Sequence, residues 1–317
     1  KDPTGKWASK WKPDGGEVVR AYIASGTVDG KKGRELFCGK FFVDSLRTSG
    51  SPRVFEMRAV SIPMNTPIRR KMITKAWEKK TLKGIAQEIA AAAKVKLLFD
   101  SKENPSYDRQ DQKAESNLKF LSRLCEDAGL SIKVTDSQIV IFDQAFYEKK
   151  KPVKTLTLGV SDILSWDFES QQSETYKSCT ISYRNPKEKK KSSAGGYTSN
   201  EYDIDAVPEK KNPAVMTYTY VDPNADDDGQ EYQVKKRATS IDEAKRIAKA
   251  TLRKLNLRKM TGSLSLVGDT SLVAGVVIKL KGFGSFDGGF IIESASHSVS
   301  TSGYVTSLSV RRVNNNY

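Results

Sequence analysis

Apolar and polar residues alternate along three segments near the start of the chain. These segments are residues 18–24, 35–44 and 53–60. A period of two is typical of strands that bury one face. Gly30 and the Ser-Gly-Ser-Pro cluster at 49–52 supply turns between the segments. The pattern therefore predicts an antiparallel meander with one buried face.

The apolar period changes from two to 3.6 at about residue 76. Thr81 can cap a first helix, and Ser116 can cap a second helix that Gly129 is placed to end. The residues expected on the apolar faces are Leu82, Ile85, Ala86, Ile89, Ala90 and Ala93 in the first helix, and Leu118, Leu121, Leu124 and Cys125 in the second. Residues 131–135 and 138–143 read as a hairpin. The region is predicted to be a small α/β module of two helices and a hairpin.

Strand patterns return in the last part of the chain, on both sides of one helix. The predicted strands are 155–159, 163–169, 179–183, 261–266, 275–281, 290–294 and 305–310. The helix, at about 240–257, begins with a capping box in which Ser240 and Glu243 satisfy each other's backbone N–H groups. The interval from about 185 to 235 is predicted to be a mobile loop region, with a basic loop at 187–196 and an acidic loop at 222–229.

One strand–turn–strand motif occurs twice in the sequence. Residues 39–45 lead through Ser49-Gly50 to 54–60, and residues 289–294 lead through Ser302-Gly303 to 305–310. The glycines are 11 residues apart in the first copy (39 to 50) and 14 in the second (289 to 303), which implies a three-residue insertion. Two copies suit two related β-domains that flank an inserted module. The alternative is a chance similarity, since short β-hairpins share composition.

Composition bounds the class of protein. Of the 317 residues, 38% are hydrophobic and 29% are charged, as in a soluble globular chain of about two domains. No segment approaches the roughly 20 apolar residues of a spanning helix, and residues 1–5 lack an apolar signal region, so neither a membrane-spanning nor an exported chain is expected. Three scattered cysteines and one histidine give no metal-ligand spacing and favour a reducing compartment, so assembly in a cytoplasm is expected.

The net charge of +15 makes nucleic acid or an acidic protein surface a candidate partner. The charge concentrates at Lys149-Lys150-Lys151 and at 187–191, beside Pro or Gly/Ser-rich stretches. Such runs are usually solvated loops. Aromatic and basic residues do not interleave along one strand, as a base-stacking platform requires, so nucleic-acid binding is the weaker hypothesis.

Two motifs share some features with metal or phosphate sites. Residues 224–229 place oxygen ligands like a calcium loop, but the twelfth position is Lys235 where that loop needs a bidentate Glu. The glycine-rich stretch 282–289 lacks the spacing of a dinucleotide loop and has no Lys-Ser/Thr, so a hairpin is expected there. No metal or cofactor-binding residue is predicted.

One histidine, several carboxylates and one cysteine are candidates for catalysis. The chain has no Gly-x-Ser-x-Gly nucleophile motif for which His297 could act as the base. His297 is therefore expected to be a strand histidine with a satisfied hydrogen bond. Most of the candidate carboxylates are expected on polar helix faces; they are Glu88, Glu115, Glu126 and Asp127. An accidental acid pair of the glycosidase type stays open among 38 carboxylates. Cys125 is expected to be a small core residue. No catalytic residue is predicted.

Short motifs spread over nearly the whole chain carry a family resemblance. They are residues 2–7, 11–16, 38–41, 59–63, 75–78, 107–112, 115–125, Asp143, 147–148, 282–284, His297 and 303–304. In order and spacing they resemble the phage late control gene D protein family, the baseplate hub proteins of contractile phage tails, tailocins and related contractile injection systems.

This resemblance implies an α+β, mainly β fold: two tail-tube-like β-barrel domains with an inserted small α/β module. The expected domains are 1–66, a first barrel that lacks its N-terminal strands; 67–150, the insertion; and 151–317, the second barrel. Three subunits then offer six barrels. Such a homotrimer is a pseudo-hexameric ring that joins the six-fold tail tube to the three-fold central spike.

The function implied by the resemblance is structural and not enzymatic. The expected partners are two further copies of the chain, the tail tube protein, the central spike protein and other baseplate proteins, with transient contact to DNA in the channel. No cofactor is expected, and the location is the tail baseplate of a virion or tailocin. The lysines at 187–191 are expected to point outward. The alternatives are a peptidoglycan hydrolase that uses two acids and a basic nucleic-acid-binding module.

Overall fold

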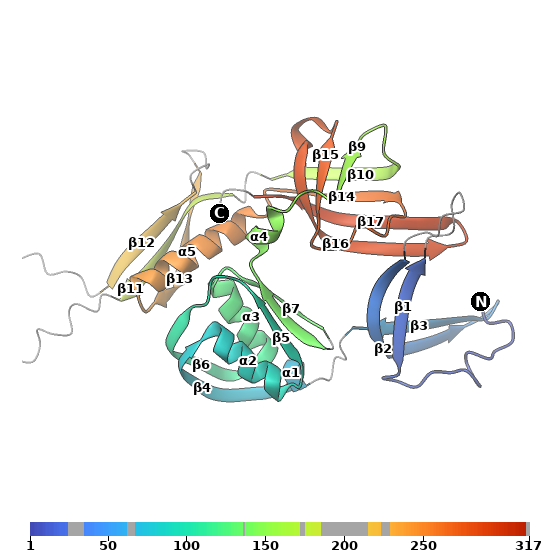
Figure 1. Cartoon of the computed structure of the whole chain (residues 1–317), viewed down its shortest axis with the longest axis horizontal. Helices are drawn as coiled ribbons and strands as arrows, with labels where there is room; N and C mark the ends of the chain where they lie inside the picture. Colours follow the sequence, from blue (N-terminus) through green and yellow to red (C-terminus); the bar gives the residue numbers. More distant parts are fainter. Residues whose placement is uncertain are drawn as a thin grey trace, which may run out of the picture. The chain divides into compact units, whose positions relative to one another are not determined.

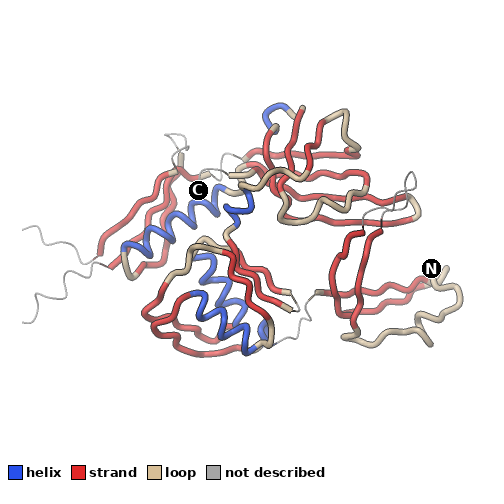
Figure 2. The backbone as a smooth tube through the Cα atoms, viewed as in Figure 1, coloured by secondary structure: helices blue, strands red, loops and turns tan. Residues whose placement is uncertain are grey.

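The computed structural model describes residues 1–24, 35–61, 67–135, 137–171, 175–184, 215–222 and 229–314. Strands dominate these ranges and helices are few (Figures 1 and 2). The chain divides into two compact units: the first comprises 1–126, 130–168 and 262–313, and the second comprises 127–129, 169–261 and 314–317. Within the described ranges, none of the helices is both long and apolar enough to cross a membrane.

The first sheet is the antiparallel meander that the alternation predicts. Its strands are β1 (Val18–Ala24), β2 (Glu35–Ser49) and β3 (Val54–Val60), in the order β1-β2-β3. Strand β2 runs five residues beyond the predicted end, because the chain turns only at 50–53. The face expected to be buried is mostly half-buried, and Val43 is its one core residue among those described. Three strands alone bury little apolar surface, so most side chains of this sheet keep some contact with water.

The α/β module confirms both predicted helices and the hairpin. Helix α2 (Leu82–Ala92) begins at Thr81, whose Oγ1 accepts a hydrogen bond from Gly84 N at 3.1 Å. Helix α3 (Asn117–Asp127) begins after Ser116, whose Oγ accepts from Lys119 N at 3.3 Å. The hairpin consists of β7 (Ser131–Val134) and β8 (Gln138–Phe142).

The module also contains elements that the sequence pattern missed. They are α1 (Pro67–Arg70), β4 (Met72–Thr81), β5 (Lys96–Asp100), β6 (Ser106–Ser116) and α4 (Gln144–Glu148). Strands β4 and β6 form an antiparallel pair, and β5 joins the hairpin in a sheet of order β5-β8-β7. Strand β4 is largely exposed, and most residues of β6 are polar even where they are buried, so neither strand shows the apolar alternation that identifies a strand.

A curled six-stranded sheet contains the second copy of the repeated strand–turn–strand motif. Its strands are β9 (Lys154–Thr157), β10 (Ile163–Ser170), β14 (Met260–Val267), β15 (Val277–Lys281), β16 (Gly288–Ser300) and β17 (Gly303–Arg312), and all six were predicted. The order is β10-β14-β17-β16-β15-β9. The expected hairpin at 282–289 connects β15 to β16 through a single 3₁₀ turn.

Aromatic rings fill the inside of this curled sheet. The ring of Phe168 on β10 lies 5.5 Å from Phe283, 5.4 Å from Phe286 and 5.6 Å from Phe290. These contacts join the edge strand β10 to the β15–β16 connection, so the sheet must curl. Gly262 makes room for the Phe168 ring, because a Cβ at that position would lie 2.1 Å from Phe168 Cδ1.

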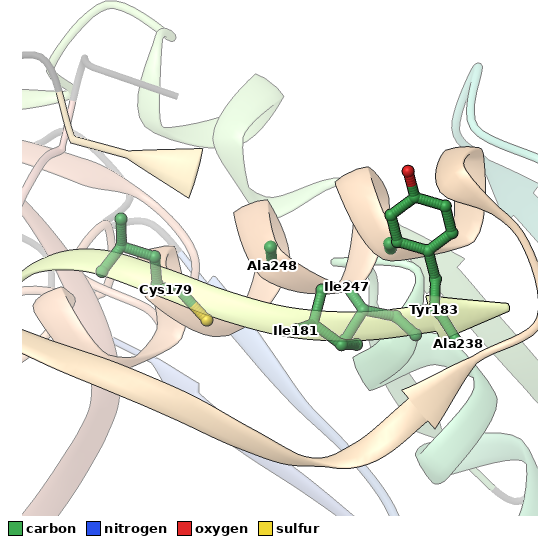
Figure 3. Close-up of a cluster of buried hydrophobic side chains, with 8 residues drawn as sticks. Cys179, Ile181, Tyr183, Ala238, Ile247 and Ala248 are labelled. Atoms are coloured by element: carbon green, nitrogen blue, oxygen red, sulfur yellow. The ribbon is translucent and has the colours of Figure 1, made fainter. Parts of the chain in front are cut away.

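The second unit is a three-stranded sheet covered by one helix. Strands β11 (Tyr176–Arg184), β12 (Val215–Val221) and β13 (Gln230–Ala238) lie in the order β12-β11-β13, and β13 runs parallel to β11. Helix α5 (Ile241–Asn256) confirms the prediction at 240–257. Cys179 and Ile181 of β11 pack against Ile247 and Ala248 of α5 to form its core (Figure 3).

Two details of this unit differ from the prediction. Strands β12 and β13 occupy part of the interval expected to be loops, because both pair with β11 despite their polar flanks. Residues 187–196 and 223–228 lie outside the described residues. At the start of α5, Ser240 Oγ accepts from Glu243 N, but the Glu243 carboxylate accepts from Thr239 N at 2.7 Å instead of from Ser240 N.

Candidate assembly surface

Each copy of the repeated strand–turn–strand motif is part of a three-stranded meander, and the two meanders have the same strand order. In the first meander β2 pairs antiparallel with β1 and β3, and in the second β16 pairs antiparallel with β15 and β17 (Figure 1). The pairing sets β1 equivalent to β15, β2 to β16 and β3 to β17. The repeat in the sequence therefore corresponds to two meanders with the same strand order and direction.

Both meanders carry a β-bulge at an acidic residue. Asp44 is the extra residue of β2, between Val43 paired with Ala59 and Ser45 paired with Arg58. Glu293 is the extra residue of β16, between Ile292 paired with Val310 and Ser294 paired with Ser309. In each case a serine follows the acid. A bulge bends its strand and redirects a side chain, and its shared position marks the two strands as equivalent.

A glycine with positive φ precedes each bulge by five residues. Gly39 and Gly288 both have φ +131°, which favours glycine because it has no Cβ. The equivalent of Gly39 is therefore Gly288, not the Gly289 of the sequence comparison. Ser45 to its partner Arg58 is 13 residues (45 to 58), and Ser294 to Ser309 is 15 (294 to 309). The second hairpin is longer by two residues and not by the predicted three, because the glycines at the turns occupy different positions in the two hairpins.

The bulged acids meet arginines in different surroundings. Asp44 Oδ2 lies 4.0 Å from Arg58 Nε at an exposed site. Glu293 Oε1 lies 3.2 Å from Arg311 Nε, and Arg311 also donates from Nη2 to Glu148 Oε1 of α4 at 2.5 Å. The side chains of Arg311 and Glu148 are fully buried. A buried pair of this kind stabilises only while both partners are present.

The two meanders differ most in how far one face is covered. Val18 pairs with Phe42 in the first meander, and the equivalent pair in the second is Val277 with Ile291. Val18 is 49% exposed, whereas Val277 is 4% exposed. In the second meander Arg311, opposite Ile291, meets Glu148 on this face. The first meander has no such cover among the described residues.

The uncovered face combines aromatic and basic side chains. Successive cross-strand pairs of β1 and β2 on this face are Val18 with Phe42, Arg20 with Lys40, and Tyr22 with Phe37. The rings of Tyr22 and Phe37 are 4.9 Å apart and both residues are 53% exposed. Lys40 Nζ lies 5.1 Å from the centre of the Phe42 ring. We call these six residues the basic–aromatic face. The sequence pattern did not reveal this face, because its aromatic and basic residues alternate across two paired strands and not along one, and β2 has a bulge at Cys38.

His297 lies in a strand and its Nδ1 is hydrogen-bonded, as predicted, but its buried Nε2 has no hydrogen-bond partner among the described residues. Its Nδ1 is 2.8 Å from Tyr304 Oη and 3.2 Å from Thr306 Oγ1, all on the β16–β17 hairpin. Tyr304 also packs over Gly268, where a Cβ would lie 2.0 Å from the ring. Hydroxyl partners hold the ring in place, and no carboxylate orients it among the contacts described for it.

Three of the four candidate carboxylates are paired with cations. Glu88 of α2 accepts from Lys80 at 2.5 Å and from Lys75 at 3.4 Å, and the Lys80 hydrogen bond holds the pKa of Glu88 below its usual value. Asp127 pairs with Lys236, and Glu126 is exposed. The expectation of a polar helix face is wrong for Glu115. It lies buried in β6 and accepts from Arg123 Nη2 at 2.8 Å.

Glu115 belongs to a buried polar network that explains one of the family motifs. Trp77 Nε1 donates to Gln112 Oε1 at 3.2 Å, and Gln112 Nε2 donates to Glu115 O and to Asn117 Oδ1, each at 3.0 Å. Gln112 is fully buried. A buried amide must have its partners, so the motif residues 107–125 serve the interior of the module.

The remaining candidates are also structural. Burial raises the pKa of the Cys125 thiol to about 12, which confirms a core residue and excludes a thiolate at neutral pH. The three lysines at 149–151 are exposed, as predicted. In the described part of the chain, no group of three or more His, Cys, Asp or Glu side chains could hold a metal ion. The calcium-like loop lies almost wholly outside that part.

A cleft of about 360 Å³ lies beside β9 in the curled sheet. Lys154 donates to Asp269 Oδ2 at 2.5 Å, and Asp269 Oδ1 accepts from the backbone N and Oγ of Ser271. Burial alone would raise the pKa of Asp269, but the hydrogen bonds from Lys154 and Ser271 outweigh it and lower that pKa. An ionised, saturated carboxylate is suited to fixing the loop and not to proton transfer.

Comparisons with known proteins give the family of this chain. The family model "Phage tail baseplate hub (GPD)" matches residues 68–303. The "Probable baseplate hub protein" of Escherichia phage P2 is 28% identical over 182 residues, which cover 56% of this chain and 45% of the phage protein. The match therefore spans less than half of that relative's length.

Solved structures share the fold. The tail protein from Neisseria meningitidis MC58 has a TM-score of 0.64 at 14% identity, covering 95% of this chain and 91% of that one. The 43 kDa tail protein of prophage MuSo2 from Shewanella oneidensis has 0.61 at 13%, covering 94% and 91%. The E. coli c3393 protein, a type VI secretion component described as similar to T4 gp27 and gp5, has 0.51 at 14%, covering 93% and 64%. At these identities the likeness shows the fold alone.

Proposed function

The chain belongs to the phage tail baseplate hub (GPD) family, and from this premise we propose that it is a structural hub whose trimer forms a pseudo-hexameric ring. The ring joins the tail tube to the central spike of a contractile tail. The particle is a virion or a tailocin, assembled in the bacterial cytoplasm.

The observation that carries the proposal is the repeated meander with its equivalent acidic bulges. A chain with two equivalent β-modules presents six of them in a trimer, and closed cyclic assemblies are the usual form of such rings. One protein can then meet a six-fold tube on one side and a three-fold spike on the other. No catalytic chemistry is needed for this task, and we propose none.

The proposed domains are those expected from the sequence. Residues 1–66 form the first tube-like barrel, around β1–β3. Residues 67–150 form the inserted module, and residues 151–317 form the second barrel, around the curled sheet, with β11–β13 and α5 as an addition to it. Support comes from the equivalence of the two meanders and from the mainly β fold shared with tail proteins.

The proposed partners are two further copies of the chain, the tail tube protein, the central spike protein and other baseplate proteins. Obligate rings bury large interfaces, commonly above about 2,000 Å² in total, so the assembly can survive contraction. DNA or another cargo would pass through the channel with only transient contact. We propose that the lysines at 187–191 point outward, because lysines on the lumen would retain DNA.

The test is assembly with purified tube and spike proteins. A trimeric mass, alone or on addition of the spike, and a ring between tube and spike in cryo-EM images are the expected results. A chain that stays monomeric with both partners present contradicts the proposal. So does a zymogram in which the chain clears peptidoglycan and loses that activity when one acid is mutated.

A further inference from the structure

A groove in the α/β module lies between helix α2 and strand β5, which contact each other (Figure 1). Its volume is about 350 Å³, within the range of ligand-binding clefts. Most of its lining is apolar, and the alanines on the helix side leave room for a side chain from outside. The lining residues are Lys83, Gln87, Ala90 and Ala91 of α2 together with Val95, Leu97 and Phe99.

Strand β5 is also an open edge of its sheet. The strand order is β5-β8-β7, so β5 has a neighbour on one side only among the described strands. The backbone N–H of Lys96 and the backbone C=O of Asp100 form hydrogen bonds on the β8 side. Alternate residues of a strand direct their N–H and C=O groups to opposite sides. Leu97 and Phe99 therefore present theirs to the open side, where another chain can pair with them.

The open backbone groups and the groove belong to the same two residues. Leu97 and Phe99 are two apart in a strand, so their side chains point to one face, and both line the groove. A strand that pairs with β5 places its own side chains opposite Leu97 and Phe99 on that same face. Main-chain hydrogen bonds combined with a pocket for alternate side chains are the way in which sheet edges bind extended peptides.

The charge of the lining favours an acidic residue in such a peptide. Lys83 is the one charged residue in the lining, and it is exposed. Glu88 on the same helix is already bound by Lys75 and Lys80. Within the described part of the chain, no ion pair is formed by Lys83. A carboxylate brought into the groove would therefore find a cation that is not shared with another acid.

The chain direction places this cation at one end of the groove. Only residues 93–95 connect α2 to β5, so the helix and the strand run in opposite directions. The end of α2 with Ala91 lies toward Leu97, and the start of α2 with Lys83 lies toward Phe99. An apolar side chain therefore fits opposite Leu97, and a carboxylate fits opposite Phe99.

We infer that the groove binds an extended segment of another protein as an antiparallel strand on β5, with an apolar side chain opposite Leu97 and a carboxylate opposite Phe99. Antiparallel pairing is the more stable kind per residue. In that direction the acid precedes the apolar residue by two positions. The site lies wholly within the α/β module, so it goes beyond the proposed function and does not depend on it.

A synthetic peptide tests the site. The probe is a capped, fluorescein-labelled peptide of sequence Ser-Thr-Glu-Thr-Val-Thr-Ser, in which Glu and Val have the required order and spacing. A second peptide carries Lys in place of Glu. Fluorescence anisotropy with the full-length chain measures the binding of both. We expect saturable binding of the first peptide with a Kd below about 1 mM.

Two pairs of variants locate the binding. A91W fills the groove, and A92W adds the same ring at the next position of α2, which is not in the lining. K83E reverses the charge in the groove, and K133E does so on β7. All four side chains are exposed, so circular dichroism and the melting temperature should stay as in the unchanged chain.

A91W should weaken binding of the Glu peptide at least about tenfold, because the indole takes the place of the bound side chain. K83E should weaken it about fivefold and make the Lys peptide the better ligand. A92W and K133E should bind as the unchanged chain does.

Three results would overturn the inference. They are no saturation by the unchanged chain, equal binding by A91W and A92W, and an unchanged peptide preference in K83E. A dimer in sedimentation that A91W abolishes would assign the edge to a second copy of the chain and overturn it too. The hub function is decided separately, by assembly with tube and spike.

Discussion

Tyr22 and Phe37 stand half-exposed on the first meander, whereas Phe290, Ile291 and Ile292 of the second meander are 2% exposed or less. Both meanders share strand order, an acidic bulge and a glycine at φ +131°. The second adds β9, β10 and β14, an aromatic interior and the Glu148 contact. The difference separates what specifies the meander from what stabilises it. Both meanders share the backbone geometry, but only the second has this face covered by other residues of the chain.

The largest expected effect concerns the two acid–arginine pairs. We expect E148Q to lower the free energy of unfolding by about 3 kcal/mol, because the buried Arg311 then keeps only the partly exposed Glu293 as a charge partner. The counterpart D44N in the first meander should cost less than about 1 kcal/mol, since that pair is exposed. Urea unfolding followed by tryptophan fluorescence measures both. Equal losses would contradict the difference in cover.

The aromatic interior provides the next test. We expect G262V to cost about 2–3 kcal/mol, because a Cβ would lie 2.1 Å from the Phe168 ring and 2.7 Å from Asp167 O. The control G15A has nothing within 4 Å of its new methyl group and should change stability by less than about 0.5 kcal/mol. The same urea titration compares them. A tolerated G262V would mean that the rings do not pack as described.

The repeated glycines test the equivalence itself. G39A and G288A should each cost about 1–2 kcal/mol, because both glycines have φ +131°, a conformation that a side chain strains. Thermal unfolding of the two single variants measures the losses. If only one of them were destabilised, the two positions would not play the same part.

The smallest expected effect is a dependence on pH. The pKa of Asp269 is lowered in the folded chain, so its contribution to stability is present above the ordinary aspartate pKa of 3.8 and is lost as pH falls through the folded value. D269N should therefore cost less than about 1 kcal/mol at pH 7, and the cost should vanish in acid. Unfolding at pH 7 and near pH 3 gives the comparison. A cost that persists at low pH would assign the loss to packing and not to charge.

Local signals in the sequence predict much of the fold. Thr81, Ser116 and Ser240 cap helices as expected, because capping depends only on neighbouring residues. The meander strands and the curled sheet follow from alternation. Strands β4 and β6 were missed because strands of mostly polar residues show no apolar alternation. Strands β12 and β13 were missed because their flanks resemble loops.

The candidate surface was harder to predict because it depends on register. The pairing of Tyr22 with Phe37 requires a bulge at Cys38, which no local pattern indicates. Glu148 and Arg311 are 163 residues apart, so their buried pair is invisible before the chain is folded. Glu115 has the charge of a surface residue and lies inside, because Arg123 and the neighbouring amide network satisfy it.

The unequal arms of the two hairpins have a geometric consequence. Beyond the bulge, the first arm has five paired residues, Ser45 to Ser49, and the second has seven, Ser294 to Ser300. At roughly 3.4 Å per residue, the paired part of the second arm is about 7 Å longer. In the proposed trimer, a long and a short hairpin would each occur three times. A partner that contacts only the long hairpins would therefore meet three equivalent sites, whereas a partner that contacts the shared parts of both would meet six.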